Sequence, residues 1–284
     1  MPKSAALRRS LIMVSALRPE DFGLAADSGA DMVCADLEDG TLPRRREEAR
    51  AAVFGIFAGT GRPGLQRLLR INSPRTEDGL RDILAVIGSD TPPDGIIMPK
   101  VSDSEEVRIA ADLIRPHHRD VDLIALIENP EGLRKVDAIA KAAPEMSALF
   151  FGSADYSAET GCDRSWDSLA YARARIVNAA KEAGIDAIDG AWFDPHDHEG
   201  FLEETRRVVA MGFTGKVSYE LAHVPHIHAA LAPSAKQIDD ARRIVAAADG
   251  DTVGITRLDG RMVNESIVRS ARKVLTAASF VAED

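Results

Sequence analysis

The chain has 284 residues, of which 45% are hydrophobic and 28% are charged, a composition typical of a globular protein with a full core. Its formal net charge of -10 argues against a nucleic-acid partner, which would require a basic face, but it leaves an anionic small molecule open. No apolar run reaches the roughly 20 residues that span a bilayer, so we expect no membrane partner.

The cysteine content and the start of the chain indicate the compartment. Cys34 and Cys162 are too few to build a disulfide framework, which favours a reducing environment. Residues 1–9, before the first predicted strand, lack a long apolar region. We therefore expect a cytoplasmic protein.

Short apolar runs recur along the chain at intervals of roughly 20 to 35 residues, as expected when parallel strands alternate with crossover helices. Their hydrophobicity is continuous and not alternating, which predicts that both faces of the sheet are covered. The eight predicted strands lie at residues 11–14, 32–35, 66–71, 95–98, 123–127, 148–151, 187–193 and 216–219.

Segments with helical spacing and capping chemistry separate these strands. One helix opens at Pro19, and another opens at Ser104, where the following glutamates suit the positive end of the helix dipole. A third runs from Glu199 to Met211 and ends at Gly212. The alternation of strands and helices is therefore regular along most of the chain.

Eight strand–helix units within about 225 residues predict a (β/α)8 TIM barrel, which we place at residues 1–232. A doubly wound open sheet is the alternative, although it usually has fewer strands for this length. Residues 233–284 are predicted to form a C-terminal helical extension, with helices from Pro233 to Ala248 and from Glu265 to Ser279. The extension would be a lid, an arm that joins subunits, or a cover on the outside of the barrel.

Charged and polar residues follow the predicted strands, at the end of a barrel where active sites lie. Charges scattered over a surface would not keep this register, so we take these residues as candidates for a functional site. They are Arg18, Glu38, Asp39, Arg70, Asn72, Lys100, Glu128, Asp155, Asp194, Glu220 and His223.

Glu128 and Asp155 are the most informative pair among them. They follow adjacent predicted strands, and two neighbouring carboxylates repel each other unless a cation lies between them. Mg²⁺ prefers one or two carboxylates together with waters and substrate oxygens. The alternative is a salt bridge with Arg70 or Lys100. Arg70 has the planar fork that suits a substrate carboxylate, or it pairs structurally with Glu38 or Asp39.

Two other chemistries receive little support. Five of the seven histidines lie between His196 and His228, but their spacings match no strong zinc pattern. Ser153 and Ser157 lack the G-x-S-x-G context of a serine hydrolase.

The strand-end residues lie in short motifs whose ordered set resembles the aldolase/citrate lyase family, in its citrate lyase β-subunit-like branch, which includes malyl-CoA lyases and related thioesterases. The resemblance covers nearly the whole chain. The matching segments are Arg9-Ser10-Leu11 with Arg18-Pro19, Ala35-Asp36-Leu37-Glu38-Asp39-Gly40, Leu69-Arg70-Ile71-Asn72, Met98-Pro99-Lys100-Val101, Ala125-Leu126-Ile127-Glu128, Phe151-Gly152-Ser153-Ala154-Asp155 and Leu258-Asp259-Gly260-Arg261-Met262-Val263.

The resemblance implies a (β/α)8 barrel, a trimer or hexamer, that uses Mg²⁺ to cleave or form carbon–carbon bonds by retro-aldol or Claisen chemistry. The implied substrates are CoA thioesters of hydroxy-dicarboxylic acids such as malyl-CoA or citramalyl-CoA. By position, it implies that Glu128 and Asp155 bind the metal and that Arg70 clamps the substrate carboxylate. The remaining implied site residues are Glu38 and Asp39 for metal-bound waters, Arg18 and Lys100 for positive charge, and Asn72, Asp194 and Glu220 for the substrate.

The sequence departs from the family pattern at two places. Asn264 stands where members usually carry an aspartate that acts as a general acid or base. Residues 218–223 replace an Ile-His-Pro-x-Gln segment associated with CoA. Three alternatives therefore stay open: a thioesterase at the same metal site, a 2-oxo acid aldolase that does not use CoA, and a non-catalytic barrel that binds a dicarboxylate.

Overall fold

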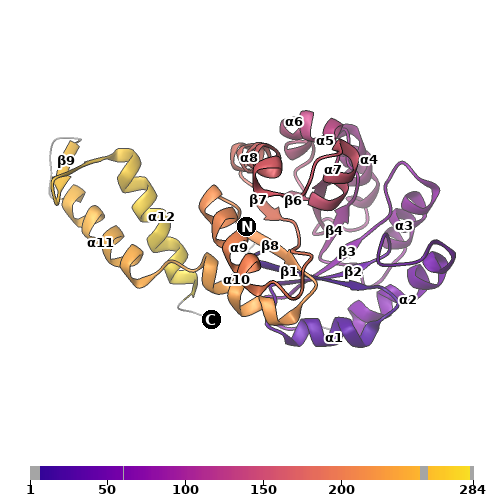
Figure 1. Ribbon diagram of the computed structural model, residues 1–284. Helices are drawn as coiled ribbons and strands as arrows, with labels where there is room; N and C mark the ends of the chain where they lie inside the picture. The colour runs from indigo at the N-terminus through magenta and orange to yellow at the C-terminus, as the bar shows by residue number, and fades with distance from the viewer. Residues whose placement is uncertain (1–6, 60, 250–254, 282–284) are drawn as a thin grey trace. The chain divides into compact units, whose positions relative to one another are not determined.

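The computed structural model describes residues 7–59, 61–249 and 255–281 (Figure 1). Eight parallel strands form a closed barrel in which each strand pairs with the next and β8 pairs with β1. This arrangement confirms the predicted (β/α)8 fold. The strands are β1 (Ser10–Ser15), β2 (Met32–Asp36), β3 (Gln66–Arg70), β4 (Gly95–Met98), β5 (Asp122–Ile127), β6 (Met146–Phe151), β7 (Asp186–Asp189) and β8 (Gly215–Ser218).

Helices connect consecutive strands and surround the barrel (Figure 1). Their ends carry the capping chemistry that the sequence indicates: Asp103 and Glu106 form a capping box at the helix that follows β4. The helices are α1 (Pro19–Asp27), α2 (Arg46–Gly59), α3 (Glu77–Ile87), α4 (Ser104–Ile114), α5 (Pro130–Arg134), α6 (Val136–Ala140), α7 (Ser153–Thr160), α8 (Trp166–Ala183), α9 (His198–Met211) and α10 (Val224–Leu231), with short 3-10 helices η1 (Pro43–Arg45) and η2 (Leu221–His223).

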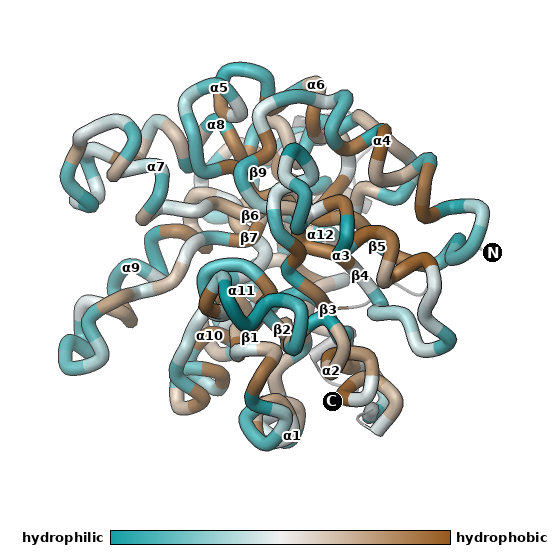
Figure 2. Tube along the Cα trace, turned by 90° about the vertical axis from the view of Figure 1, so that its right-hand side faces the viewer, coloured by the Kyte–Doolittle hydropathy of each residue, from teal (hydrophilic) through white to brown (hydrophobic). Residues whose placement is uncertain are grey.

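The apolar core has two layers, which explains the continuous hydrophobicity of the strands. Side chains such as Leu11, Cys34 and Ile124 fill the interior of the barrel, and a larger set lies between the strands and the helices. In Figure 2, β5 has the brown colour of hydrophobic residues, whereas α7 includes hydrophilic, teal segments. The barrel is thus a filled core, and polar residues concentrate at its ends.

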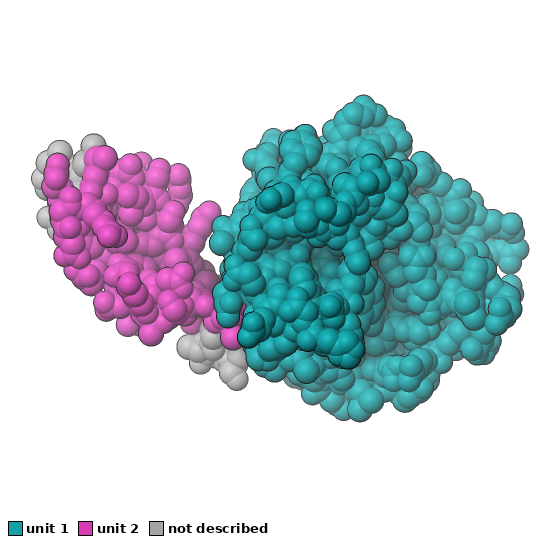
Figure 3. Space-filling model, in the orientation of Figure 1, with its two compact units in different colours: residues 1–228 teal, residues 229–284 magenta. Residues whose placement is uncertain are grey.

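The chain divides into two compact units, Met1–His228 and Ala229–Asp284 (Figure 3). The second unit has its own buried residues, among them Ala241, Val263 and Val268. Its elements are α11 (Ala235–Asp249), the antiparallel pair β9 (Ile255–Leu258) and β10 (Arg261–Asn264), and α12 (Glu265–Val281). The predicted domain boundary after residue 232 and the predicted role of the extension stay predictions.

Strand β7 is shorter than predicted, since it ends at Asp189 and not near residue 193. A Cβ atom at Gly190 would lie 2.8 Å from the carbonyl oxygen of Phe151, so the chain after β7 passes close to the end of β6 and leaves no room for a side chain. Within the described residues, no helix is long and apolar enough to cross a bilayer. The prediction about the start of the chain falls in part on residues 1–6, which lie outside the described residues.

Candidate functional site

Glu128 and Asp155 lie at the carboxyl ends of two adjacent strands. Glu128 directly follows β5, and Asp155 lies in the first turn of α7, which follows β6. The ends of these strands are in register, with Ile127 opposite Phe151. Both carboxylates line a cavity of about 490 Å³ together with Lys100. The structure therefore brings the predicted metal pair together, with Asp155 on a helix where the sequence predicted a strand end.

The backbone around Glu128 is shaped to hold its side chain. Glu128 is only 3% exposed, and its Oε1 accepts a 2.7 Å hydrogen bond from the backbone N–H of Lys100. Lys100 has a φ of 56°, an uncommon value for a residue with a side chain. Gly152 provides space as well, because a Cβ atom there would overlap the Glu128 side chain. Such local constraints are typical of functional positions.

The charge of Glu128 is poorly compensated by its surroundings. Burial is the main cause that raises the pKa of this carboxyl, and the negative charges of Asp155 and Glu38 raise it further, to about 8. The hydrogen bond from Lys100 and the charge of Arg70 oppose this shift without cancelling it. A cation between Glu128 and Asp155 would instead lower the pKa of Glu128, because it would stabilise the ionised carboxylate.

Arg70 is held by two acidic residues on the neighbouring strand and the loop that follows it. It lies opposite Asp36 in the register of β2 and β3, and its Nε donates a 2.7 Å hydrogen bond to Asp36 Oδ1. Its Nη1 lies 3.2 Å from Glu38 Oε2. Of the structural partners considered for Arg70, the structure shows Glu38. It also shows Asp36, which the candidate set omitted although an acidic residue closing an apolar strand was a visible signal.

Lys100 extends this group toward the cavity. Its ammonium forms an ion pair with Glu38 and lies 3.9 Å from Asp39 Oδ1. Burial would lower the pKa of Lys100, but the hydrogen bond to Glu38 and the nearby carboxylates raise it overall. Burial also raises the pKa of Glu38, and Arg70 and Lys100 only partly oppose this. Lys100 is therefore protonated near neutral pH.

Together these residues form a cluster with an excess of negative charge, which we call the acidic cluster. Its five carboxylates face two cations, so three negative charges stay uncompensated when all groups are ionised. Its members are Asp36, Glu38, Asp39, Glu128 and Asp155 with Arg70 and Lys100.

The donor set fits a hard divalent cation. No three His, Cys, Asp or Glu side chains within the described ranges are placed to hold a metal by themselves. A metal at Glu128 and Asp155 would therefore need further oxygen ligands from waters or substrate, which is the habit of Mg²⁺. The cavity beside the pair provides the space for them.

Four predicted site residues make their contacts elsewhere than with the metal pair. In the part of the chain that the structure describes, no hydrogen bond or ion pair joins Arg18, Asn72, Asp194 or Glu220 to Glu128 or Asp155. Arg18 is exposed and pairs with Asp21. The amide of Asn72 is buried and donates to the Leu37 carbonyl and to Asp82. Asp194 and Glu220 are exposed on loops after β7 and β8.

The segment after β8 contains a residue that the candidate set missed. The ring of Tyr219 lies 6.2 Å from that of Phe193. Partial burial raises the pKa of the Tyr219 phenol. The positive charge of Arg70 lowers this pKa, and the negative charges of Asp36 and Asp39 raise it. Tyr219 therefore lies near the acidic cluster. His223 instead stacks on Phe201 at 3.7 Å, and burial lowers the pKa of its imidazole, as expected for a packed histidine.

Comparisons with known proteins give one consistent result. The sequence profile of the HpcH/HpaI aldolase/citrate lyase family matches residues 9–220. The chain is 29% identical to the citrate lyase subunit beta of Escherichia coli K12 over 96% of this chain and 94% of that protein. It is 28% identical to the L-malyl-CoA/beta-methylmalyl-CoA lyase of Rhodobacter capsulatus over 98% and 97% of the two chains.

A solved structure gives the same result for the fold. The protein CitE from Mycobacterium tuberculosis, in complex with magnesium, acetoacetate and coenzyme A, superposes with a TM-score of 0.83. It is 30% identical to this chain, and the match covers 96% of this chain and 99% of that one.

Proposed function

This chain belongs to the HpcH/HpaI aldolase/citrate lyase family, and from that premise we propose that it is a Mg²⁺-dependent carbon–carbon lyase. The family confirms the resemblance seen in the sequence, and the relatives compared above are lyases. The proposed substrate is a hydroxy-dicarboxylic acyl thioester such as malyl-CoA or citramalyl-CoA. The observation that carries this proposal is the buried, mutually repelling pair of Glu128 and Asp155 beside an open cavity.

Glu128 and Asp155 are the proposed ligands of Mg²⁺. When bound, the ion would stabilise the negative charge that develops on substrate oxygens as the carbon–carbon bond breaks or forms. The hydrogen bond from the Lys100 backbone orients Glu128. Glu38 and Asp39 are proposed to accept hydrogen bonds from waters around the ion.

Arg70 and Lys100 are proposed to bind the anionic part of the substrate. The bond to Asp36 fixes the guanidinium plane of Arg70, so little conformational entropy is lost when a substrate carboxylate binds. The raised pKa of Lys100 keeps it positively charged, so it serves as a hydrogen-bond donor and not as a base. The proposed contacts of Arg18, Asn72, Asp194 and Glu220 with the substrate rest on the resemblance alone.

Asn264 has a structural use in this chain. Its Oδ1 accepts a 3.1 Å hydrogen bond from the backbone N–H of Ile267, three residues further on, which caps the start of α12. A carboxamide does not exchange protons as a carboxylate does. We therefore assign no proton transfer to this position.

We further propose a homo-oligomer, a trimer or hexamer, in the cytoplasm. The two cysteines support a reducing compartment, since both are free. Light scattering on the purified protein would measure the oligomeric state. A monomer at working concentrations would contradict this part of the proposal.

Product identification tests the reaction. The protein would be incubated with Mg²⁺ and malyl-CoA or citramalyl-CoA, and we expect acetyl-CoA with glyoxylate or pyruvate. Malate or citramalate with free CoA would instead indicate a thioesterase. Cleavage of a free hydroxy-oxo acid alone would indicate an aldolase that does not use CoA. Binding without turnover would indicate a non-catalytic barrel.

A further inference from the structure

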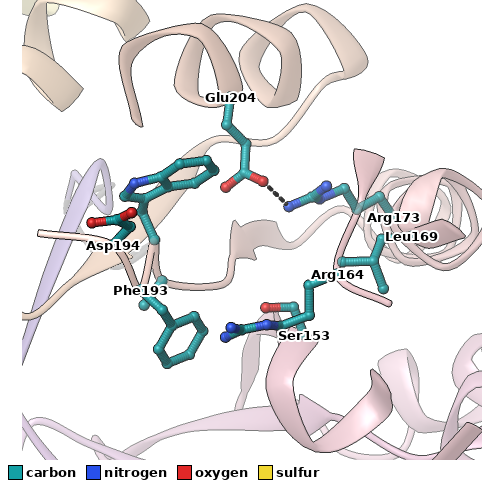
Figure 4. Close-up of a pocket in the computed structure, with 9 residues that line it drawn as sticks. Ser153, Arg164, Leu169, Arg173, Phe193, Asp194 and Glu204 are labelled. Atoms are coloured by element: carbon teal, nitrogen blue, oxygen red, sulfur yellow. Dashed lines mark hydrogen bonds and ion pairs between the residues drawn. The ribbon is translucent and has the colours of Figure 1, made fainter. Parts of the chain in front are cut away.

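A second cavity lies beside the proposed metal centre, at the carboxyl ends of β6 and β7. It has a volume of about 160 Å³. Figure 4 shows the labelled side chains around it, with Arg173 and Glu204 joined by an ion pair and Arg164, Ser153 and Phe193 across the gap. We call it the donor pocket, and its lining includes Ser153, Arg164, Arg173, Trp192, Phe193 and Glu204. Apart from Asp194, its lining residues have no role in the proposed lyase reaction.

A buried ionic network fixes Arg173 at the wall of this pocket. The Nε of Arg173 donates a 2.9 Å hydrogen bond to Asp189, and its Nη2 donates a 2.8 Å bond to Glu204. Lys216 donates to the same two carboxylates, at 2.8 Å and 2.9 Å. These four residues form what we call the balanced network, because two cations meet two carboxylates.

Two buried donors in the pocket wall have no hydrogen-bond acceptor among the described residues, and the guanidinium that carries one of them, that of Arg173, also lies over the rings of Trp166 and Phe151. The side chain of Arg173 is 2% exposed, and its Nη1 makes no hydrogen bond within the described residues. The indole Nε1–H of Trp192 is also without a partner among those residues. Buried donors without acceptors are uncommon and cost free energy. Two of them on one small cavity indicate that an acceptor belongs there.

Both carboxylates in the lining already accept hydrogen bonds. Both oxygens of Glu204 accept hydrogen bonds from the balanced network. Asp194, the other carboxylate in the lining, accepts the backbone N–H of His196 through Oδ1. Arg164 adds a positive charge and lies over the Phe193 ring at 4.7 Å. Glu204 is therefore fully engaged, whereas the buried Arg173 Nη1 and Trp192 Nε1 lack acceptors among the described residues.

We propose that the donor pocket binds the carboxylate of a small organic acid, with Arg173 Nη1 and Trp192 Nε1 as its hydrogen-bond donors. A carboxylate forms charge-assisted bonds with a guanidinium, which are stronger than bonds to a neutral acceptor. The volume of about 160 Å³ corresponds to about five waters at about 30 Å³ each, which suits a small acid. Binding requires neither the metal pair nor turnover.

The ligand carboxylate has two possible sources. Ser153 begins α7, the helix that also carries Asp155, so the pocket adjoins the proposed metal centre. Malyl-CoA and citramalyl-CoA have a single free carboxylate, which is the one proposed to bind Arg70. The ligand of the pocket is therefore either a second free carboxylate on a larger acyl thioester or the carboxylate of a separate small acid. Both share the same recognition chemistry, and kinetics distinguishes them below.

The indole resonances provide a direct test, because the chain contains only two tryptophans. The full-length, metal-free protein would be titrated with malonate while the two indole N–H signals are followed by NMR. We expect the Trp192 signal to shift downfield as its Nε1–H gains an acceptor, with a smaller change at Trp166. Trp166→Phe assigns the signals. Absence of a shift at Trp192, as expected if only ordered water fills the pocket, would overturn the proposal.

Two exposed arginines provide a matched pair of variants. Arg164 lines the pocket, whereas Arg207 lies over the Trp166 ring at 3.9 Å outside the lining. Arg164→Gln should weaken malonate binding about two- to fivefold, the range for an exposed charge pair, and Arg207→Gln should leave it unchanged. Equal effects of the two substitutions would contradict the assignment. Neither arginine is buried, so both variants are expected to fold.

Two further measurements separate this site from the proposed function. Malonate should still shift the Trp192 signal in Glu128→Gln, and loss of that shift would contradict an independent site. If the pocket holds a second free carboxylate of a larger acyl thioester, Arg164→Gln raises KM for that substrate with little change in kcat. If it holds a separate acid, KM is unchanged while malonate binding weakens.

Discussion

The acidic cluster and the balanced network lie in the same barrel, but a buried carboxylate has its pKa raised in the first and lowered in the second. Each is built on a pair of opposite charges that face each other on adjacent strands: Asp36 and Arg70 on β2 and β3, and Asp189 and Lys216 on β7 and β8. In the balanced network, Lys216 and Arg173 outweigh burial and lower the pKa of Asp189. In the acidic cluster, the pKa of Glu128 rises to about 8.

The difference lies in what surrounds each strand pair. The balanced network adds one cation and one carboxylate, so its charges cancel and it leaves no negative charge for a metal cation to neutralise. The acidic cluster adds four carboxylates and one cation, which leaves negative charge without a partner. Burial alone therefore does not mark a functional site in this barrel. The charge that the protein leaves uncompensated marks the place where a cation belongs.

The largest expected effect follows from removing a carboxylate of the acidic cluster. Glu128→Gln or Asp155→Asn should lower Mg²⁺-dependent activity by more than about a hundredfold, because even residues that only orient metal ligands contribute about 10- to 100-fold. Steady-state rates with the substrate identified above measure this. Glu159→Gln is the control, because Glu159 lines the same cavity but is exposed. Full activity of Glu128→Gln would refute the assignment.

A substitution in the balanced network should instead affect stability. Asp189→Asn leaves Arg173 and Lys216 short of a buried partner, and we expect the free energy of unfolding to fall by about 3 to 5 kcal/mol. Urea denaturation measures it. In Glu203→Gln, which breaks an exposed pair with Arg206, the change should stay below about 1 kcal/mol. An equal free energy of unfolding in Asp189→Asn and Glu203→Gln would show that the balanced network does not stabilise the fold.

The pH dependence of stability should also distinguish the two groups. The folded-state pKa of Glu128 lies above the value of 4.5 for a free glutamate, so between about pH 4.5 and pH 8 the folded metal-free protein binds more protons than the unfolded chain. The contribution of the protonated Glu128 to the stability of the fold is therefore lost as pH rises through this range. The loss should be a few kcal/mol, since one pKa unit corresponds to about 1.4 kcal/mol.

Thermal unfolding of the metal-free protein at several pH values would measure this loss. Glu128→Gln should lack the Glu128-dependent part of the loss, and Mg²⁺ should reduce it in the unsubstituted protein. A wild-type profile that coincides with that of Glu128→Gln would show that Glu128 does not titrate in this range.

The smallest expected effect lies outside both groups, at the cap of α12. Asn264→Ala should destabilise the second unit by about 1 kcal/mol, the usual cost of losing a helix cap. Asn264→Asp retains a capping oxygen and should have nearly the stability of the unsubstituted protein. Circular dichroism during thermal unfolding distinguishes the two. Equal losses in both variants would show that the cap contributes nothing.

The sequence predicted the barrel because its signals are local. Each strand is a continuous apolar run, and Gly, Pro and capping residues separate it from the next helix, so the strand count follows without knowledge of the packing. Strand β7 was placed too long because Ala191, Trp192 and Phe193 continue its apolar run. The close approach at Gly190 ends the strand, and a close approach between segments is not a local signal.

The functional site was predictable only in part, for the same reason. Glu128 and Asp155 were visible as charges that close apolar runs. Asp36 was visible too, but its pairing with Arg70 depends on strand register, which the sequence does not state. The balanced network escaped prediction because its members lie on four elements, although Asp189 and Lys216 stand out as charges inside apolar strands.

Metal binding tests the central claim most directly. Calorimetric titration of the metal-free protein with Mg²⁺ should show one ion per chain, bound with release of protons below about pH 8 because the raised pKa of Glu128 must be overcome. Glu128→Gln should lose this binding, and Glu159→Gln should retain it. Equal Mg²⁺ affinity in the unsubstituted protein and in Glu128→Gln would contradict the account.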